Sequence, residues 1–111
     1  MPLASAINPI WAILEFSGDR TLLITDRFLL LQANTVGGTQ TVTIPPHSDV
    51  AFNVGDQLSF EQKNTAVLDI ADGAGVNIDS RGALFIANGR FAVFSIVQDE
   101  IDNWVLFGDL A

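Results

Sequence analysis

Short apolar runs alternate with turn residues along almost the whole chain, and this succession constrains the fold more than any other feature of the sequence. Several runs alternate apolar and polar residues, so their period is 2 rather than the 3.6 of a helix. Strands at roughly ten-residue spacing are typical of all-β sandwiches and barrels. The sequence therefore predicts short strands over 11–16, 21–25, 28–33, 39–44, 57–62, 66–70, 76–78, 84–86, 91–97 and 104–107.

Turn residues define where several of these strands end. Pro45-Pro46 must end the strand over 39–44, because proline cannot donate to a sheet ladder. Asn88-Gly89 is a hairpin signal, and residues 99–102 predict another turn. We expect an all-β fold, an antiparallel β-sandwich of jelly-roll or Greek-key type. Residues 1–16 would form an apolar N-terminal arm and the first strand, and residues 17–111 the sandwich domain.

The composition excludes several classes of site and partner. The 111 residues include no cysteine and one histidine, which excludes a disulfide scaffold, a thiolate zinc site and a site built from several histidines of one chain. We therefore expect no metal and no cofactor. The net charge of -8 repels phosphate, so we expect neither nucleic acid nor an anionic membrane as a partner.

Three groups of polar residues have the residue types of an active site but not its spacing. Residues 72–79 are similar to one turn of a calcium-binding β-roll, which needs stacked copies. The acids within 99–102 share one predicted turn, whereas a glycosidase needs carboxylates that face each other across a sugar. The adjacent residues 47–49 contain His, Ser and Asp but seldom align as a triad. We therefore predict that the protein is not an enzyme.

Two segments are apolar at consecutive positions, 22–24 and 28–31. Such strands are typical of sheets covered on both faces. One interpretation is a central strand with some exposed leucine, and the other, which we favour, is a subunit interface. Charged residues make up only 16% of the chain, against about 25% in an average soluble domain, which also favours surface hidden in partners. The candidates for subunit packing are Leu22, Ile24, Leu29 and Leu31.

The first residues of the chain pose a similar choice between a frayed terminus and an arm that lies on a neighbouring subunit or another surface. We favour the arm, because its apolar side chains recur at short intervals. The apolar run ends at Glu15, short of the roughly 20 residues that span a bilayer. Trp11 and Trp104 are candidates for stacking on a sugar, but core or interface packing is the commoner role. The expected arm contacts are Leu3, Ile7, Ile10, Trp11 and Ile13.

The second half of the chain contains the segment TVTIP over residues 41–45 and ends with WVLFGDL over residues 104–110. With these segments it resembles the small β-domain of tail fibres, head fibres and capsid decoration (cement) proteins of tailed bacteriophages. In that domain a TVTLP strand leads to F-x-G-T-x-I-x-x-x-Q, a GVTI strand, a glycine-bracketed turn and a W-x-L-x-GDL ending. The resemblance covers residues 39–110, and its most specific part is the closing tryptophan–GDL element. The segments that carry it are Thr39–Pro45, Phe52–Gln62, Ala74–Ile78, Gly89–Ala92 and Asn103–Leu110.

The resemblance implies a β-sandwich, commonly trimeric, with a structural or adhesive role and no cofactor. The chain departs from the pattern at Asp56, where threonine is usual, and it lacks the long shaft of a complete tail fibre. We therefore expect a capsid decoration protein that forms homotrimers and stabilises contacts between capsomers, with the major capsid protein as its partner. The acidic charge favours the outer capsid surface, away from packaged DNA, after synthesis in the host cytoplasm.

The alternative is a tail or baseplate adhesion module that binds a host-surface saccharide through its loops. Its candidate residues are Asn64, Asn88, Arg90 and Asp102.

Overall fold

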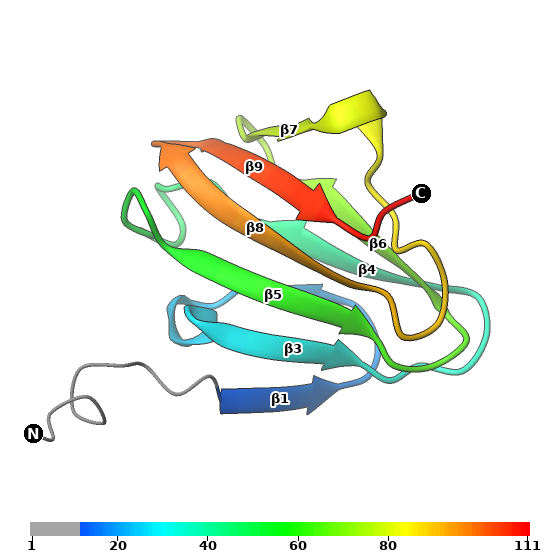
Figure 1. The fold of residues 1–111 in the computed structure, drawn as a ribbon. Coiled ribbons are helices and arrows are strands. Elements are labelled where there is room, and N and C mark those ends of the chain that lie inside the picture. Colours follow the sequence, from blue (N-terminus) through cyan, green and yellow to red (C-terminus); the bar gives the residue numbers. More distant parts are fainter. Residues whose placement is uncertain (1–11) are drawn as a thin grey trace, which may run out of the picture.

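The computed structural model describes residues 12–111, which form an all-β fold (Figure 1). Two short 3-10 helices, η1 (Ile24–Asp26) and η2 (Arg81–Ala83), interrupt the strands, and the described residues contain no α-helix. The expected all-β class is therefore confirmed. The strands are β1 (Ala12–Phe16), β2 (Arg20–Thr21), β3 (Leu29–Ala33), β4 (Thr39–Ile44), β5 (Gln57–Gln62), β6 (Val67–Asp72), β7 (Asn77–Ser80), β8 (Val93–Glu100) and β9 (Asn103–Gly108).

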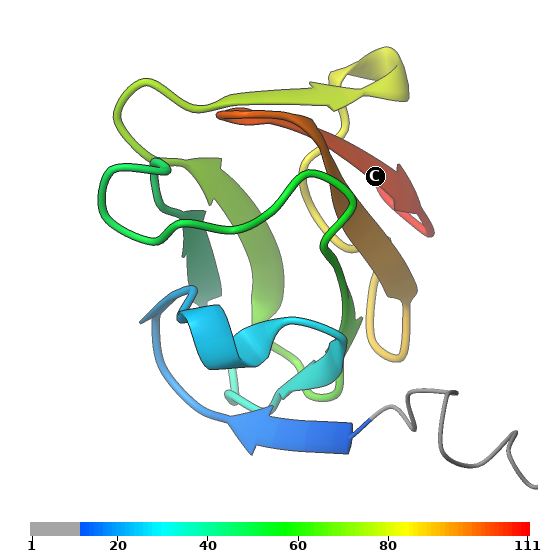
Figure 2. The same cartoon turned by 90° about the vertical axis from the view of Figure 1, so that its left-hand side faces the viewer.

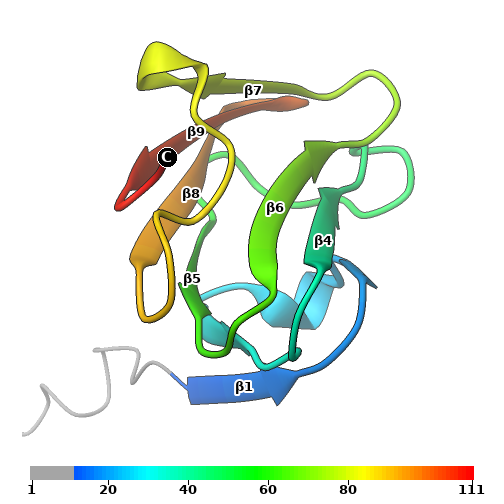
Figure 3. The ribbon, with the colours of Figure 1, turned by 90° about the vertical axis from the view of Figure 1, so that its right-hand side faces the viewer.

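The first six strands form three successive coils, each with one strand in each of two sheets (Figure 3). β1, β3 and β5 lie side by side in the six-stranded sheet, which we call sheet A. β2, β4 and β6 make up the three-stranded sheet, which we call sheet B. Because each strand pairs in parallel with its counterpart in the next coil, this part of the chain stacks like a short solenoid.

The C-terminal third continues sheet A in the order β5-β8-β9-β7. β8 and β9 form an antiparallel hairpin, as the turn signal at residues 99–102 predicts. The strand expected over 84–86 is not formed: this segment makes an isolated bridge between Ile86 and Asp69 of β6. The amide of Ile70 donates to the carbonyl of Phe85 at 2.9 Å, so this segment covers the free edge of β6.

The antiparallel arrangement expected from the sequence is wrong for most of the sheet pairing. Five of the seven strand pairs are parallel, and only β5–β8 and β8–β9 are antiparallel. Parallel neighbours usually need a crossover of a dozen or more residues, often a helix. In the four parallel pairs of the coils, the crossover between two strands of one sheet contains a strand of the other sheet, so no helix is required. The fifth parallel pair, β7–β9, is connected through η2 and β8 of the same sheet.

The core lies between the two sheets and is filled by the inward side chains of alternating strands. Trp104 of β9 is 1% exposed and packs edge-on against Phe52, with ring centroids 5.3 Å apart. Phe60 of β5 stacks on Phe94 of β8 at 5.4 Å. Val42 and Ile44 of β4 complete the opposite wall, and β4 ends directly before Pro45, as expected.

Candidate interaction surface

Sheet B has an ordinary outward face. β4 buries Gln40, Val42 and Ile44 and directs its threonines, such as Thr41, outward. β6 likewise buries Leu68 and directs Asp69 away from the core, together with Val67 and Ala71. On β4 this alternation of buried and polar outward residues is what a sheet with one solvated face requires. It provides an internal standard for judging the outward face of sheet A.

The outward face of sheet A departs from that standard. Its central row crosses five strands in register and consists of Ile13, Leu30, Ser59, Ser95 and Phe107. The next row consists of Gln57, Val97 and Val105. We call these eight side chains the uncharged face, since none of them carries a charge.

Two large exposed side chains lie at opposite sides of the uncharged face, and a hollow lies between them. Ile13 is 62% exposed on β1, and Phe107 is 46% exposed on β9. A shallow hollow of about 280 Å³ is lined by Leu30, Gln57, Ser59 and Val93. Between the hollow and Phe107 the hydroxyls of Ser59 and Ser95 are hydrogen-bonded to each other at 2.7 Å. The face therefore combines a protruding aromatic ring with a recess of apolar and small polar residues.

The connections that lead into β3 and β5 lie at the same end of the sheets (Figure 2). A groove of about 540 Å³ opens there, and Leu23 and Ile24 line it with large exposed parts of their side chains. We call it the end groove; its lining residues are Leu23, Ile24, Thr25, Asp49, Val50 and Ala51. The connection that carries Leu23 and Ile24 leads to Leu29, the register partner of Ala12. Ala12, the first described residue, therefore lies at the end of sheet A that bears this groove.

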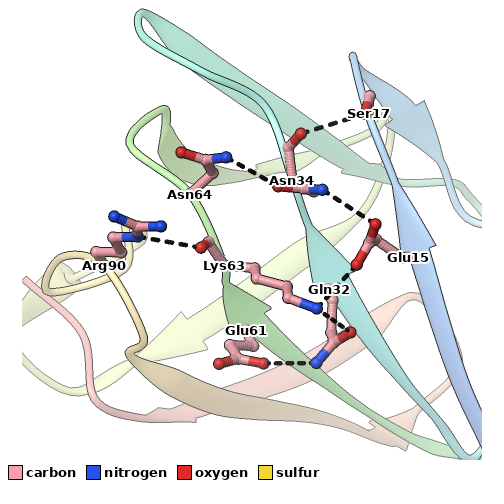
Figure 4. Close-up of polar contacts among 8 residues, drawn as sticks. All are labelled: Glu15, Ser17, Gln32, Asn34, Glu61, Lys63, Asn64 and Arg90. Atoms are coloured by element: carbon pink, nitrogen blue, oxygen red, sulfur yellow. Dashed lines mark hydrogen bonds and ion pairs between the residues drawn. The ribbon is translucent and has the colours of Figure 1, made fainter.

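The ends of β1, β3 and β5 that lie away from the end groove are held together by a ladder of polar side chains (Figure 4). Asn34 donates to Glu15 at 3.0 Å and accepts from Asn64 at 2.9 Å. Gln32 donates to Glu61 at 2.9 Å, in the row next to the central row of the uncharged face. These bonds connect the three coils to one another and form a polar border beside the uncharged face.

Lys63 lies at the centre of this ladder and sets the ionisation of Glu15. Its Nζ is 2.9 Å from Oε2 of Glu15, and that hydrogen bond is the main reason why the pKa of Glu15 is lowered, with a further contribution from Asn34. The same hydrogen bond raises the pKa of Lys63. The stabilisation from Glu15 is complete above its unfolded pKa and is lost as the pH falls through the folded pKa. The stabilisation from Lys63 is complete below its unfolded pKa and is lost as the pH rises through the folded value.

Lys63→Met is expected to raise the pKa of Glu15 towards its ordinary value of 4.5, because the main cause of the lowering is removed. A carboxyl-detected NMR titration measures this shift. Asp79 is the internal control, since its pKa is lowered by Asn77 and Asn103 and not by Lys63. A Glu15 pKa that stays unchanged in the variant would contradict the assigned ion pair.

The residues predicted as interface contacts separate into three groups. Ile13 is exposed on the uncharged face, and Ile24 is exposed in the end groove. Leu22 and Leu31 are 0% exposed, so their assignment to subunit packing is wrong: they fill the core of their own chain. Leu29 is partly buried and packs inward against that core, which corrects its assignment as well. The predicted arm contacts at Leu3, Ile7, Ile10 and Trp11 lie outside the described residues.

Sequence reasoning missed Val93, Val97, Val105 and Phe107 as surface candidates. Their signal is the run over 91–97, which is apolar on both strand faces, followed by the apolar alternation of β9. The inward positions of β8 and β9 are already occupied by residues such as Phe94 and Trp104. The outward apolar residues therefore have no role in the core.

The candidate residues of the adhesion alternative do not form a single group. Asn64 belongs to the polar ladder, and Arg90 joins it by donating from Nε to the carbonyl of Lys63 at 3.2 Å (Figure 4). Asn88 instead donates to Asp109 at 3.0 Å, and Asp102 accepts from the amide of His47 at 2.7 Å. Trp104 is buried against Phe52, which excludes it as a stacking platform for a sugar.

Among residues 12–111, no cluster of three or more His, Cys, Asp or Glu side chains has a metal-binding arrangement. No helix in the described part of the chain has the length and apolar character needed to cross a membrane. Comparison of the sequence and the structure with protein-family models, curated proteins and solved structures gave no match.

Proposed function

We propose that this chain is a structural protein of a tailed-phage virion: a capsid decoration protein that forms homotrimers on the outer capsid surface and stabilises contacts between capsomers. The observation that carries the proposal is that one small fold has two separate apolar surfaces, the uncharged face and the end groove. A protein that binds both its own copies and the capsid shell needs one surface for each. The resemblance of residues 39–110 to phage β-domains supports the virion assignment.

The mechanism of such a protein is burial of surface rather than chemistry. A specific interface of standard size buries roughly 1,600 Å². Repetition of one contact around an oligomer raises the overall affinity, since each further contact forms within the same assembly. The end groove is the proposed capsid contact, and Ala12, the first described residue, lies at the same end of sheet A. The net charge of -8 favours a site away from packaged DNA.

The experiment that tests this proposal is the copy number of the chain in purified virions, measured by quantitative mass spectrometry against the major capsid protein. A number close to that of the capsid protein supports decoration. A number comparable with that of tail proteins would move the chain to the tail and favour adhesion. Absence from virions would overturn the proposal.

Deletion of residues 1–10 is expected to leave a folded trimer that no longer binds capsids. Leu23→Ser combined with Ile24→Ser should lower capsid occupancy by at least about 10-fold, since anchors buried in an interface carry most of its binding energy. Co-sedimentation with shells that lack the protein measures both effects. Val36→Ser is the matched control, because Val36 is exposed at a turn outside both surfaces. Unchanged occupancy of both the deletion and the double variant would contradict the assigned capsid contact.

A second candidate function, saccharide binding, is favoured by one observation beside the polar ladder. The guanidinium of Arg90 lies 4.8 Å from the ring centroid of Phe91, whose side chain is largely exposed. An exposed aromatic ring next to polar groups is a suitable platform for a sugar. A glycan-array signal that Phe91→Ala abolishes, in a protein that does not bind capsids, would favour this function.

A further inference from the structure

We infer that the uncharged face of sheet A is the surface through which copies of this chain bind one another, with Phe107 of one copy seated in the hollow of the next. The inference rests on the proposed function for the number of copies, three. The surface itself is assigned from its charge, its shape and its place in the sheet.

Charge is the first argument for a second copy as the partner. Each chain carries a net charge of -8, so two copies repel each other over most of their surfaces. The least repulsive contact is a region without charged groups that is broad enough to be buried. The central row of the uncharged face meets this condition across all five strands from β1 to β9. The acidic residues of sheet A lie at its borders, with Glu15 and Glu61 on one side and Asp79, Asp99 and Glu100 on the other.

The second argument is that the apolar outward residues are not part of the core of their own chain. Val97 and Val105 are register partners that point away from the core, whereas Ile96 and Leu106 beside them fill it. Sheet B, in the same molecule, places threonines at the equivalent outward positions of β4. A centre depleted of charged residues within a polar border is the usual composition of a protein interface.

The third argument is the placement of the projecting ring and the hollow. Ser59, Ser95 and Phe107 are successive partners in one row, so the hollow beside Ser59 and the ring of Phe107 lie on opposite sides of Ser95. A closed ring of identical copies needs complementary features on the two sides of each subunit. With three such faces turned towards a common axis along β8, each Phe107 meets the hollow of the next copy.

The test uses the purified full chain, without capsids. Light scattering coupled to size-exclusion chromatography should give a mass three times the 11.9 kDa of one chain. Phe107→Glu should raise the apparent dissociation constant by at least about 100-fold, because it buries a charge in the hollow of the neighbour. Val36→Glu, which adds the same charge outside the face, should leave the mass unchanged. Circular dichroism verifies that both variants are folded, and Phe107→Ser replaces Phe107→Glu if the latter does not fold.

A charge-pair rescue locates the contact between copies. Leu30→Lys alone should also dissociate the oligomer, and Leu30→Lys with Phe107→Glu should restore it. Leu30 and Phe107 are three strands apart in one sheet, about 14 Å at the usual strand spacing, so the new pair can form only between chains. A monomeric wild-type chain, an oligomer that Phe107→Glu leaves intact, or a failed rescue would overturn the inference. A monomer that still decorates virions would leave the proposed function standing, and an oligomer absent from virions would overturn that function alone.

Discussion

Arg20→Met is expected to lower the free energy of unfolding by about 3–5 kcal/mol, because it leaves a carboxylate buried without its partner. Asp26 is 1% exposed, and both of its oxygens accept from Arg20, at 2.7 Å from Nη2 and 3.0 Å from Nε. Oδ2 also accepts from the amide of Leu23 at 2.9 Å, which fixes the start of η1. Urea unfolding followed by circular dichroism at neutral pH, at one fixed protein concentration, measures the change.

The guanidinium carbon of Arg20 lies 5.7 Å from the ring centroid of Phe16. Methionine is chosen because it keeps an apolar stem beside this ring and removes the charge. The double variant Arg20→Met with Asp26→Leu is the control. Because it buries no unpaired charge, it should recover most of the stability that the single variant loses. A single variant as stable as the wild type would show that the ion pair does not hold the β2–β3 connection.

The positions of the strands could be predicted from the sequence because alternation and turn residues act locally. The expected strands over 39–44 and 57–62 coincide with β4 and β5. β4 ends directly before Pro45-Pro46, because proline has no backbone N–H to donate to the sheet. The segment 84–86 shows the limit of this reasoning. Its alternation is that of a strand, but the segment makes only one isolated bridge, between Ile86 and Asp69 at the edge of β6.

The direction of strand pairing could not be predicted, because inward and outward alternation is the same in parallel and antiparallel sheets. The coils also lack a sequence repeat that would reveal their stacking. Equivalent positions on β1 and β3 hold the apolar residues Ile13 and Leu30, but the same position on β5 holds Ser59, which is small and polar. The three coils therefore share one backbone arrangement although their sequences differ at equivalent positions.

The interface residues could be predicted only where a run has a clear alternation. In the run 28–31 every residue is apolar, so its inward side cannot be read from the sequence, and a shift of one residue exchanges the two faces. The structure turns Leu29 and Leu31 inward and Leu30 outward. Our candidates Leu29 and Leu31 were therefore on the core side, and the residue between them lies on the uncharged face.

Gly108→Ala is expected to lower the free energy of unfolding by at least about 3 kcal/mol or to prevent folding, because overpacking and backbone strain act at the same position. Gly108 is the register partner of Phe94 on β8. A Cβ at position 108 would lie 2.7 Å from Cα of Phe94 and 2.8 Å from its Cβ. Neither atom is the free end of a flexible side chain, so relief would require β8 and β9 to separate. The φ of +129° at Gly108 is also one that residues with a Cβ rarely adopt.

Gly89→Ala separates these two causes. Gly89 has a similar φ of +137°, but nothing lies within 4 Å of its added Cβ. Its substitution therefore measures the backbone strain alone, of order 1–3 kcal/mol. The excess loss in Gly108→Ala measures the close approach of β9 to β8, which holds Phe107 in place on the uncharged face. Equal losses in the two variants, from urea unfolding under the same conditions, would show that the two strands can separate at this point without cost. The position of Phe107 would then not depend on tight packing between β8 and β9.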